Sequence, residues 1–106
     1  MNEPMTQMNE KISKRNIKRG EVWWGRLDDA EGNEQQEDRP LVIVSNNKQN
    51  EIEKLLIAVP LTRNTEKIYP FQVRTFFQGE YGKVKCEQVR AITSERLERK
   101  LDELTE

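Results

Sequence analysis

The sequence predicts one small, mainly β domain, in which short strands form a strongly bent antiparallel barrel with helical decoration (an α+β fold in the loose sense). Three observations predict this fold class. The chain has 106 residues, which suffices for one domain and is too short for two cores. Short runs of strand-forming residues recur between polar loops. One terminal segment instead carries leucines at helical spacing.

Five segments are rich in the β-branched, aromatic and aliphatic residues that favour strands. They are Arg19–Leu27, Leu41–Ser45, Leu55–Thr62, Phe71–Phe77 and Lys83–Ile92. In the last segment the apolar positions change face at Glu87-Gln88, which predicts a bulge or a strand break there. We expect polar turns at Asn46–Lys54 and at Gly79–Gly82.

Two features refine these strands. Trp23 and Trp24 are adjacent, so their side chains on a strand point to opposite faces. We expect one in the core and the other at a rim, an interface or a ligand surface. Pro60 has no N–H to donate to a neighbouring strand. We therefore expect its segment to run along a sheet edge or to bulge at the proline.

The two ends of the chain differ in pattern. Residues 1–18 are polar, with acids early and bases late, and are predicted to form a flexible tail before a domain at 19–106. Near the other end, Leu97, Leu101 and Leu104 follow helical spacing after the potential caps Thr93 and Ser94. This pattern predicts a C-terminal helix.

Composition excludes several kinds of site. There are 18 basic and 19 acidic residues, so any polyanion must be bound by a local patch. The chain has no histidine, which excludes a Ser-His-Asp triad, an imidazole base and histidine-containing zinc sites. No nucleotide-cradling glycine motif occurs either, and we expect neither cofactor nor metal.

The lack of a possible disulfide, of a membrane span and of a secretory signal indicates the cellular compartment. Cys86 is the only cysteine, so no internal disulfide can form, which fits a reducing cytoplasm. No apolar run approaches the roughly 20 residues that span a bilayer, and the N-terminus lacks the apolar core of a secretory signal. We therefore expect a cytoplasmic protein with no membrane partner.

Arg39 is the most suggestive single residue. Pro40 pushes the residue before it toward extended backbone and is tolerated as the first residue of a strand. The pair would therefore fix a permanently charged guanidinium at the end of a rigid element, as a functional group requires. The alternative is a rim arginine that pairs with Asp38 or Glu37. Thr62 ends the next strand, and whether it meets Arg39 depends on a register that the sequence does not give.

The pattern as a whole resembles a known family. "RGEVWWGRL", "GNEQQEDRPLVIVSN", "IAVPLT" and "CEQVRAITSERL" occur in the order seen in the MazF/PemK toxins of bacterial toxin–antitoxin pairs, over roughly residues 17–104. The resemblance implies an SH3-like barrel of the PemK/CcdB type at 19–106. It further implies a homodimeric, metal-independent endoribonuclease that cuts single-stranded RNA at short sequences and is silenced by a cognate antitoxin.

The resemblance also implies site residues. The family's catalytic arginine and threonine fall on Arg39 and Thr62. Positions that match the family's RNA-facing segments are Gly32, Asn33, Glu34, Gln35, Arg63, Asn64, Glu87 and Gln88.

A ribonuclease needs no protein nucleophile if the substrate's own 2′-hydroxyl attacks the phosphate. The protein must then align the attack, move protons and stabilise charge. The products would be a 2′,3′-cyclic phosphate and a 5′-hydroxyl. The general base stays unassigned, with Glu34 as a candidate.

Two alternatives remain open. A related toxin of the same fold poisons DNA gyrase through protein contact. An inactive regulator is the other, and the acids Glu37 and Asp38 beside Arg39 favour it because they would repel phosphate.

Overall fold

The computed structural model of the chain describes residues 16–27 and 38–104, and within these ranges it confirms a mainly β fold. In these described ranges, one short α-helix and two 3₁₀ turns interrupt the strands. The elements are β1 (Glu21–Gly25), β2 (Arg39–Ile43), α2 (Asn47–Ile52), β3 (Leu55–Thr62), β4 (Val73–Phe77), β5 (Glu80–Val84), η1 (Cys86–Gln88), β6 (Arg90–Thr93), η2 (Ser94–Arg96) and β7 (Leu97–Glu103).

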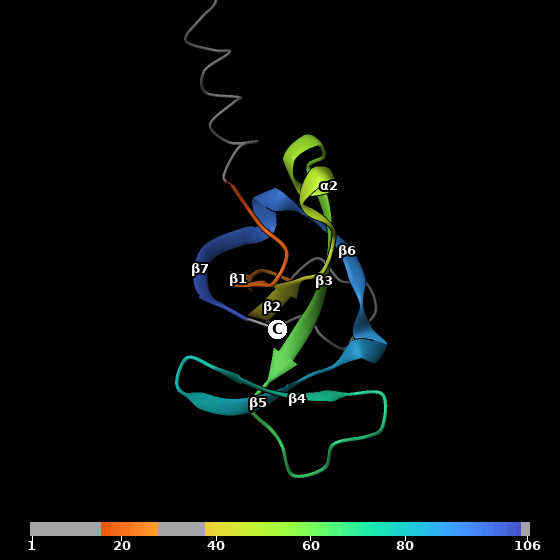
Figure 1. Cartoon of the computed structure of the whole chain (residues 1–106), viewed down its shortest axis with the longest axis vertical. Coiled ribbons are helices and arrows are strands. Elements are labelled where there is room, and N and C mark those ends of the chain that lie inside the picture. The colour runs from red at the N-terminus through yellow and green to blue at the C-terminus, as the bar shows by residue number, and fades with distance from the viewer. Residues whose placement is uncertain (1–15, 28–37, 105–106) are drawn as a thin grey trace, which may run out of the picture.

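The strands form one curled antiparallel sheet, a half-barrel (Figure 1). Its order is β4-β5-β3-β2-β1-β7, and β6 pairs with the first part of β3. The β4–β5 hairpin lies at one end of the molecule and α2 at the other (Figure 1). The first part of β3 therefore belongs to the body of the sheet, and its last residues carry the hairpin.

Both faces of the sheet bury side chains, in two clusters. Along β3, Leu56 and Ala58 belong to the first cluster, whereas Val59 and Leu61 belong to the second. The first cluster comprises Ile17, Trp23, Leu27, Leu41, Ile43, Leu56, Ala58, Ile92 and Leu97. The second comprises Val22, Val42, Val59, Leu61, Phe77 and Val84, with Leu101 and Leu104 packed against it.

The predicted C-terminal helix is wrong, because Leu97–Glu103 form β7, which pairs with β1. Two register shifts in this pairing explain the misleading pattern. A register irregularity changes which side chains face each side of the sheet. Leu97 accordingly packs in the first cluster, and Leu101 and Leu104 pack against the second. Of the predicted caps, Thr93 ends β6 and Ser94 begins the 3₁₀ turn η2.

The polar segment after β2 is also not a simple turn, because it contains the helix α2. Asn46 caps this helix by accepting a hydrogen bond from the backbone N–H of Gln49. The side chain of Asn50 is buried and donates to the carbonyl of Ser45. A buried amide that is satisfied in this way leaves no apolar periodicity in the sequence.

The hairpin turn lies earlier than predicted, at Gln78-Gly79, where both φ angles are positive (51° and 80°). Two central residues of this kind match the twist of a two-residue hairpin. The predicted break at Glu87-Gln88 is confirmed, since η1 separates β5 from β6.

Pro60 does not lie on an edge strand, which excludes the first of the two expected placements. β3 pairs with β2 on one side, with Leu41 opposite Pro60. Its other neighbour changes from β6, which ends its pairing at Ala58, to β5, which begins at Leu61. The residue without an N–H thus lies where the partner strand changes.

The start of the packed chain precedes the predicted domain boundary. Ile17 is 8% exposed and belongs to the first cluster, although we placed it in the tail. Residues 1–15 of the predicted tail lie outside the described residues. None of the helices in the described ranges is long and apolar enough to cross a membrane.

Candidate functional site

The register between β2 and β3 brings Arg39 and Thr62 together. Leu41 lies opposite Pro60, and the pairs Val42–Val59 and Ile43–Ala58 follow. The same register continued by two residues puts Arg39 opposite Thr62. Directly opposed residues of antiparallel strands carry their side chains on the same side of the sheet. This continuation agrees with the pocket at the strand ends, which both residues line.

A pocket of about 330 Å³ lies where these strands end. It is bordered by the end of β1, the start of β2, the end of β3 and the tip of the β4–β5 hairpin. A ligand there would meet two cationic side chains, a hydroxyl and two aromatic rings. The lining residues are Trp24, Asp38, Arg39, Pro40, Leu61, Thr62, Arg63, Phe77 and Gln78.

The adjacent tryptophans behave as expected. Trp23 is 7% exposed and packs in the first cluster, whereas Trp24 is half-buried and lines the pocket. The guanidinium of Arg99 lies 5.7 Å from the centre of a Trp24 ring. The next residue, Gly25, sets the strand spacing, because a Cβ there would lie 2.4 Å from Leu41 Cδ1. β1 can therefore lie close against the start of β2, where Arg39 begins.

A local turn orients the hydroxyl of Thr62. Its Oγ1 accepts from the backbone N–H of Asn64 at 3.3 Å, and Asn64 Oδ1 accepts from the N–H of Glu66 at 3.1 Å. Because the hydroxyl oxygen serves as an acceptor in the turn, its O–H can still donate to a ligand. Asn64, an expected RNA contact, thus has a structural bond in the turn.

Arg63, another expected RNA contact, holds the hairpin. Its guanidinium donates to the carbonyls of Phe77 and Glu80, each at 2.9 Å. It also lies 3.7 Å above the centre of the Phe77 ring. Arg63 lines the pocket, but much of its hydrogen-bonding capacity is directed at backbone carbonyls.

Glu87 and Gln88 lie on η1 and do not line this pocket. Glu87 Oε2 accepts from Gln72 Nε2 at 3.0 Å, which fastens the β3–β4 loop to η1. The side-chain oxygen of Gln88 is buried and has no hydrogen-bond partner within the described part of the chain. The remaining expected contacts, Gly32, Asn33, Glu34 and Gln35, lie outside the described residues.

Lys83 is a residue that sequence reasoning missed. It lies directly opposite Thr62 in the β3–β5 pairing. The residue is 8% exposed, and its ammonium donates to the carbonyl of Lys67 at 2.6 Å. Lys83 therefore follows Thr62 across the sheet, and its ammonium fastens the β3–β4 loop next to the site. Only the pairing register could have revealed it, because lysines are common throughout the chain.

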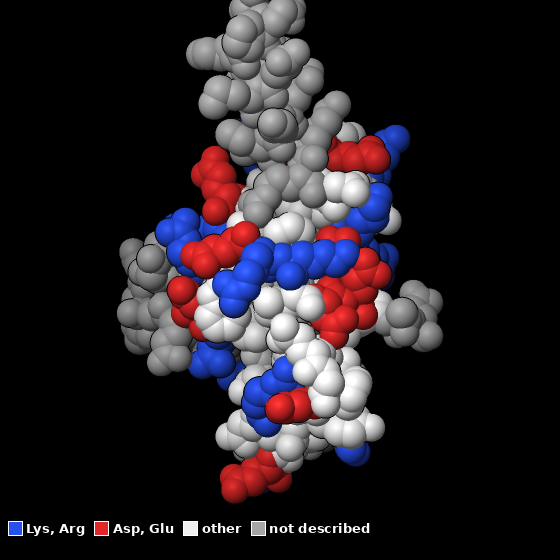
Figure 2. All heavy atoms as spheres, turned by 90° about the vertical axis from the view of Figure 1, so that its left-hand side faces the viewer, with Lys and Arg blue, Asp and Glu red and all other residues white. Residues whose placement is uncertain are grey.

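Charges on the molecule are otherwise mixed. On the side where β7 lies in Figure 1, basic and acidic side chains alternate across the middle of the surface, and the part below is mostly uncharged (Figure 2). Within the described ranges, no three His, Cys, Asp or Glu side chains gather so as to hold a metal ion.

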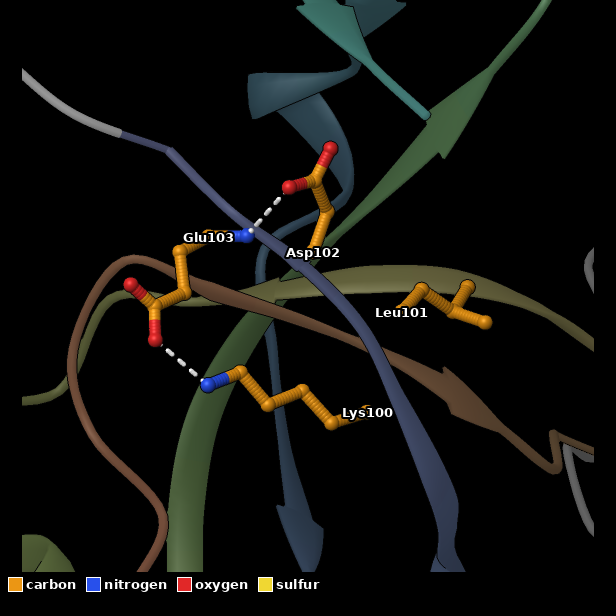
Figure 3. Close-up of a pocket in the computed structure, with 4 residues that line it drawn as sticks. All are labelled: Lys100, Leu101, Asp102 and Glu103. Carbon is orange, nitrogen blue, oxygen red and sulfur yellow. Dashed lines mark hydrogen bonds and ion pairs between the residues drawn. The ribbon is translucent and has the colours of Figure 1, made fainter. Parts of the chain in front are cut away.

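A second hollow, of about 420 Å³, lies along Lys100–Glu103 of β7 (Figure 3). Its charged groups bind one another. The Lys100 ammonium donates to Glu103 and lies 3.2 Å from Glu21 Oε2, and these two partners raise the pKa of Lys100. We interpret this cluster as structural, because its charges are used within the fold.

Glu21, on β1, belongs to the same charged cluster, and its pKa reflects these contacts. Burial raises the pKa of its carboxyl. Hydrogen bonds from the Lys18 N–H and the Trp23 indole, together with Lys100, outweigh burial, so the pKa lies below the ordinary value of 4.5. The charged carboxylate is therefore the stable form in the folded protein.

Comparison with known proteins identifies the family of this chain. Residues 18–106 match the PemK-like, MazF-like toxins of type II toxin–antitoxin systems. Endoribonuclease MazF9 of Mycobacterium tuberculosis is 39% identical over an alignment of 90 residues that covers 76% of this chain and 76% of that protein. Endoribonuclease PemK of Escherichia coli is 36% identical over 83 residues, covering 74% of this chain and 62% of that protein.

Solved structures agree with the sequence relatives. MazF from Deinococcus radiodurans superposes with a TM-score of 0.70 at 27% identity, over 84% of this chain and 82% of that one. An endoribonuclease in complex with its cognate antitoxin, from Mycobacterial species, superposes with a TM-score of 0.68 at 27% identity, over 84% and 80%. This chain therefore belongs to the PemK/MazF family of toxins of type II toxin–antitoxin systems.

Proposed function

We propose that this protein is an endoribonuclease toxin that cleaves single-stranded RNA at short sequences and is neutralised by a cognate antitoxin. The observation that carries the proposal is that Arg39, at the start of β2, and Thr62, at the end of β3, line one pocket. Two relatives are named endoribonucleases, and a structural relative was solved with its cognate antitoxin. The family thus supplies the reaction class, and the pair supplies suitable chemistry.

The proposed reaction uses the substrate's 2′-hydroxyl as the nucleophile. The 2′-oxygen loses its proton and bonds to the adjacent phosphorus while the bond from phosphorus to the 5′-oxygen breaks. The leaving 5′-oxygen takes up a proton. The products are a 2′,3′-cyclic phosphate and a 5′-hydroxyl, and no redox partner or metal ion is required.

Arg39 and Thr62 have complementary roles in this scheme. A guanidinium presents planar donors that match phosphate oxygens, and it stays charged at any working pH. Arg39 therefore stabilises the negative charge of the phosphorane and of the leaving 5′-oxygen. The Thr62 hydroxyl donates to a non-bridging oxygen. Arginine is too basic to act as the general base, which stays unassigned.

Purified protein incubated with single-stranded RNA in EDTA tests the proposal. We expect cleavage by the parent chain and a loss of roughly 10²–10³-fold in rate for Arg39→Ala or Thr62→Ala, the range seen when a transition-state donor is removed. Lys48→Ala is the matched control, because Lys48 is exposed on α2 at the opposite end of the molecule (Figure 1). Fragments with 5′-phosphate ends, or activity that EDTA abolishes, would contradict the mechanism.

Asp38 favours one alternative, the inactive regulator, because its side chain lines the same pocket as Arg39. A carboxylate there opposes phosphate binding. Asp38→Asn separates the two functions. If the protein is a ribonuclease, the variant cleaves RNA roughly 2–5-fold faster, as expected for an exposed charge worth about 0.5–1 kcal/mol. If neither chain cleaves, the regulator is supported.

We further propose that the protein works as a cytoplasmic homodimer. A chain of 106 residues buries a modest core, and Val44, Ile52, Leu55 and Val89 remain exposed by 37–66%. Light scattering at micromolar concentration tests the dimer, and a monomer at every concentration would contradict it. Pull-down with the product of the adjacent reading frame tests the antitoxin.

A further inference from the structure

We infer that the outer face of the β4–β5 hairpin, together with the β3–β4 loop, is a stacking platform that holds unpaired RNA bases beside the cleavage site. This inference rests on the proposed function. It assigns a binding role to residues that neither the sequence motifs nor the pocket includes. The platform residues are Lys67, Tyr69, Phe71, Arg74, Phe76, Tyr81 and Lys83, and we call this set the aromatic–basic row.

The register of the hairpin puts four members of the row on one face. Arg74 lies opposite Lys83, and Phe76 lies opposite Tyr81. The alternate positions of the hairpin point the other way, since Phe77 and Val84 are buried in the second cluster. The face that carries Arg74, Phe76 and Tyr81 is therefore the outer one.

Each aromatic pair in the row has a cation beside it. Phe76 and Tyr81 meet edge to face at 5.0 Å between ring centres, and the Arg74 guanidinium lies 4.1 Å from the centre of the Tyr81 ring. Tyr69 and Phe71 stack in parallel at 5.4 Å, with Lys67 Nζ 4.9 Å from the Tyr69 ring centre. Lys83 Nζ, on the hairpin, lies 6.0 Å from the same Tyr69 ring.

All four rings are exposed to solvent, by 43% for Tyr69, 53% for Phe71, 54% for Phe76 and 53% for Tyr81. Four exposed rings on one small hairpin and its neighbouring loop offer apolar surface of the kind found at binding sites. The described contacts of these rings are to one another and to cations, so faces and edges remain open to a ligand.

The loop that carries Tyr69 and Phe71 is fastened in place. Lys83 Nζ donates to the carbonyl of Lys67, and the buried Gln72 accepts from the N–H of Tyr69 through Oε1. Gln72 Nε2 donates to Glu87. A platform that is already ordered loses little entropy on binding.

The row leads directly from the candidate site. Thr62 lies opposite Lys83, and Lys83 lies opposite Arg74, so the three residues cross β3, β5 and β4 on one side of the sheet. If the β2–β3 register is continued by two residues, Arg39 lies next to Thr62 on β2, on the other side from Lys83. A polynucleotide whose phosphate is bound at Arg39 and Thr62 would next meet the exposed Arg74 and then the rings, while the buried Lys83 holds the loop beneath them.

The chemistry of the row favours RNA over a protein partner. None of the seven residues is acidic, and three are cationic. Proteins bind single strands without sequence preference through basic grooves in which aromatic rings stack on the bases. Arginine and lysine meet the phosphates while the rings meet the bases, so an interleaved row serves both parts of each nucleotide.

The test uses the full chain with a fluorescent, single-stranded 2′-O-methyl RNA of mixed sequence in EDTA. This RNA lacks the attacking hydroxyl, so binding is measured without cleavage. We expect Tyr81→Leu and Phe76→Leu each to weaken binding roughly tenfold, as loss of one stacked base predicts. The matched variants Tyr81→Phe and Phe76→Tyr keep a ring and are expected to bind within twofold of the parent.

Two further measurements separate this inference from the proposed function. On a short RNA that contains only the mapped cleavage motif, the Leu variants should keep kcat within about twofold, whereas KM rises on long RNA. If the parent chain binds 2′-O-methyl RNA through the row but leaves unmodified single-stranded RNA intact, the ribonuclease is refuted and the platform is supported. Circular dichroism confirms that each variant is folded.

The inference is overturned if folded Leu variants bind RNA as tightly as the parent. It is equally overturned if the ring-retaining variants lose as much affinity as the Leu variants. A shift in oligomeric mass or in antitoxin affinity, with RNA binding unchanged, would assign the row to a protein partner instead.

Discussion

The body of the sheet and the β4–β5 hairpin are both antiparallel, but they are attached in different ways. In the body, β1 pairs along its length with both β2 and β7, and β6 pairs with the first half of β3. The hairpin joins β3 through the two register pairs Leu61–Val84 and Thr62–Lys83 and a backbone hydrogen bond from Lys85 to Pro60. Backbone ladders therefore stabilise the body, and the hairpin depends on fewer such bonds.

Side-chain contacts supplement the backbone hydrogen bonds that hold the hairpin. Arg63 donates to two of its carbonyls, and the Asp102 carboxylate accepts from the N–H of Gln78 at 2.6 Å. Phe77 anchors it in the second cluster with 1% exposure. Thr62 therefore lies where the extensively paired body meets the less extensively paired hairpin. Substitutions at this junction should affect function more than substitutions of similar size elsewhere.

The largest expected effect comes from removing the anchor. Phe77→Ala should lower the free energy of unfolding by about 3–5 kcal/mol, and Leu56→Ala in the first cluster by about 2–5 kcal/mol. Denaturant unfolding measures both. Hydrogen exchange sharpens the comparison, because Phe77→Ala should expose the amides of β4 and β5 while β1, β2 and β6 stay protected. Equal loss of protection throughout would mean that hairpin and body unfold as one unit.

A smaller effect should come from two glycines of the hairpin. A Cβ at Gly82 would lie 2.6 Å from the carbonyl oxygen of Thr62, whereas one at Gly79 would meet nothing within 4 Å. Gly82→Ala should cost about 1–3 kcal/mol and also reduce RNA cleavage, since it pushes β5 away from Thr62. Gly79→Ala, with φ at 80°, should cost about 1–2 kcal/mol and leave cleavage unchanged.

RNA cleavage and thermal unfolding are measured for both glycine variants. If both alanine variants lose stability and keep full cleavage, the position of β5 does not control the site.

The smallest expected effect depends on pH. Hydrogen bonds from the N–H groups of Gln78 and Glu103 lower the pKa of Asp102 below its ordinary value of 3.8. The bound carboxylate therefore stabilises the fold at pH values above the ordinary pKa. This stabilisation is lost as pH falls through the lower pKa of the folded state.

Asp102→Asn should remove that acid-sensitive part of the stability, with a change below about 1 kcal/mol at neutral pH because the group is only partly buried. Chemical unfolding at a series of pH values between about 2 and 7 measures it. A variant whose stability falls in acid as steeply as the parent's would show that Asp102 does not fasten the hairpin.

Much of the fold could be predicted from the sequence because the strands of the body carry clear strand-forming runs. Leu55–Thr62 is a strand with the predicted bounds. The C-terminal segment could not be predicted, since two register shifts moved its leucines between clusters and imitated helical spacing. α2 was missed because its buried residue is an asparagine, whose hydrogen bonds leave no hydropathy signal.

The candidate site was partly predictable for a similar reason. Arg39 and Thr62 were recognisable by type and by place, at the start of one strand and the end of another. Their proximity depends on the strand register, which arises from packing across the whole sheet and has no local sequence signal. The same register brings Lys83 beside Thr62, and that neighbour could be identified only once the pairing was known.

The adjacent tryptophans give the molecule two optical reporters. Trp23 is buried in the first cluster, and Trp24 borders the pocket under the Arg99 guanidinium. A chain that keeps only the first indole would report by its emission when the core melts. A chain that keeps only the second would report when a ligand enters beside it, so folding and occupancy can be followed separately in the same molecule.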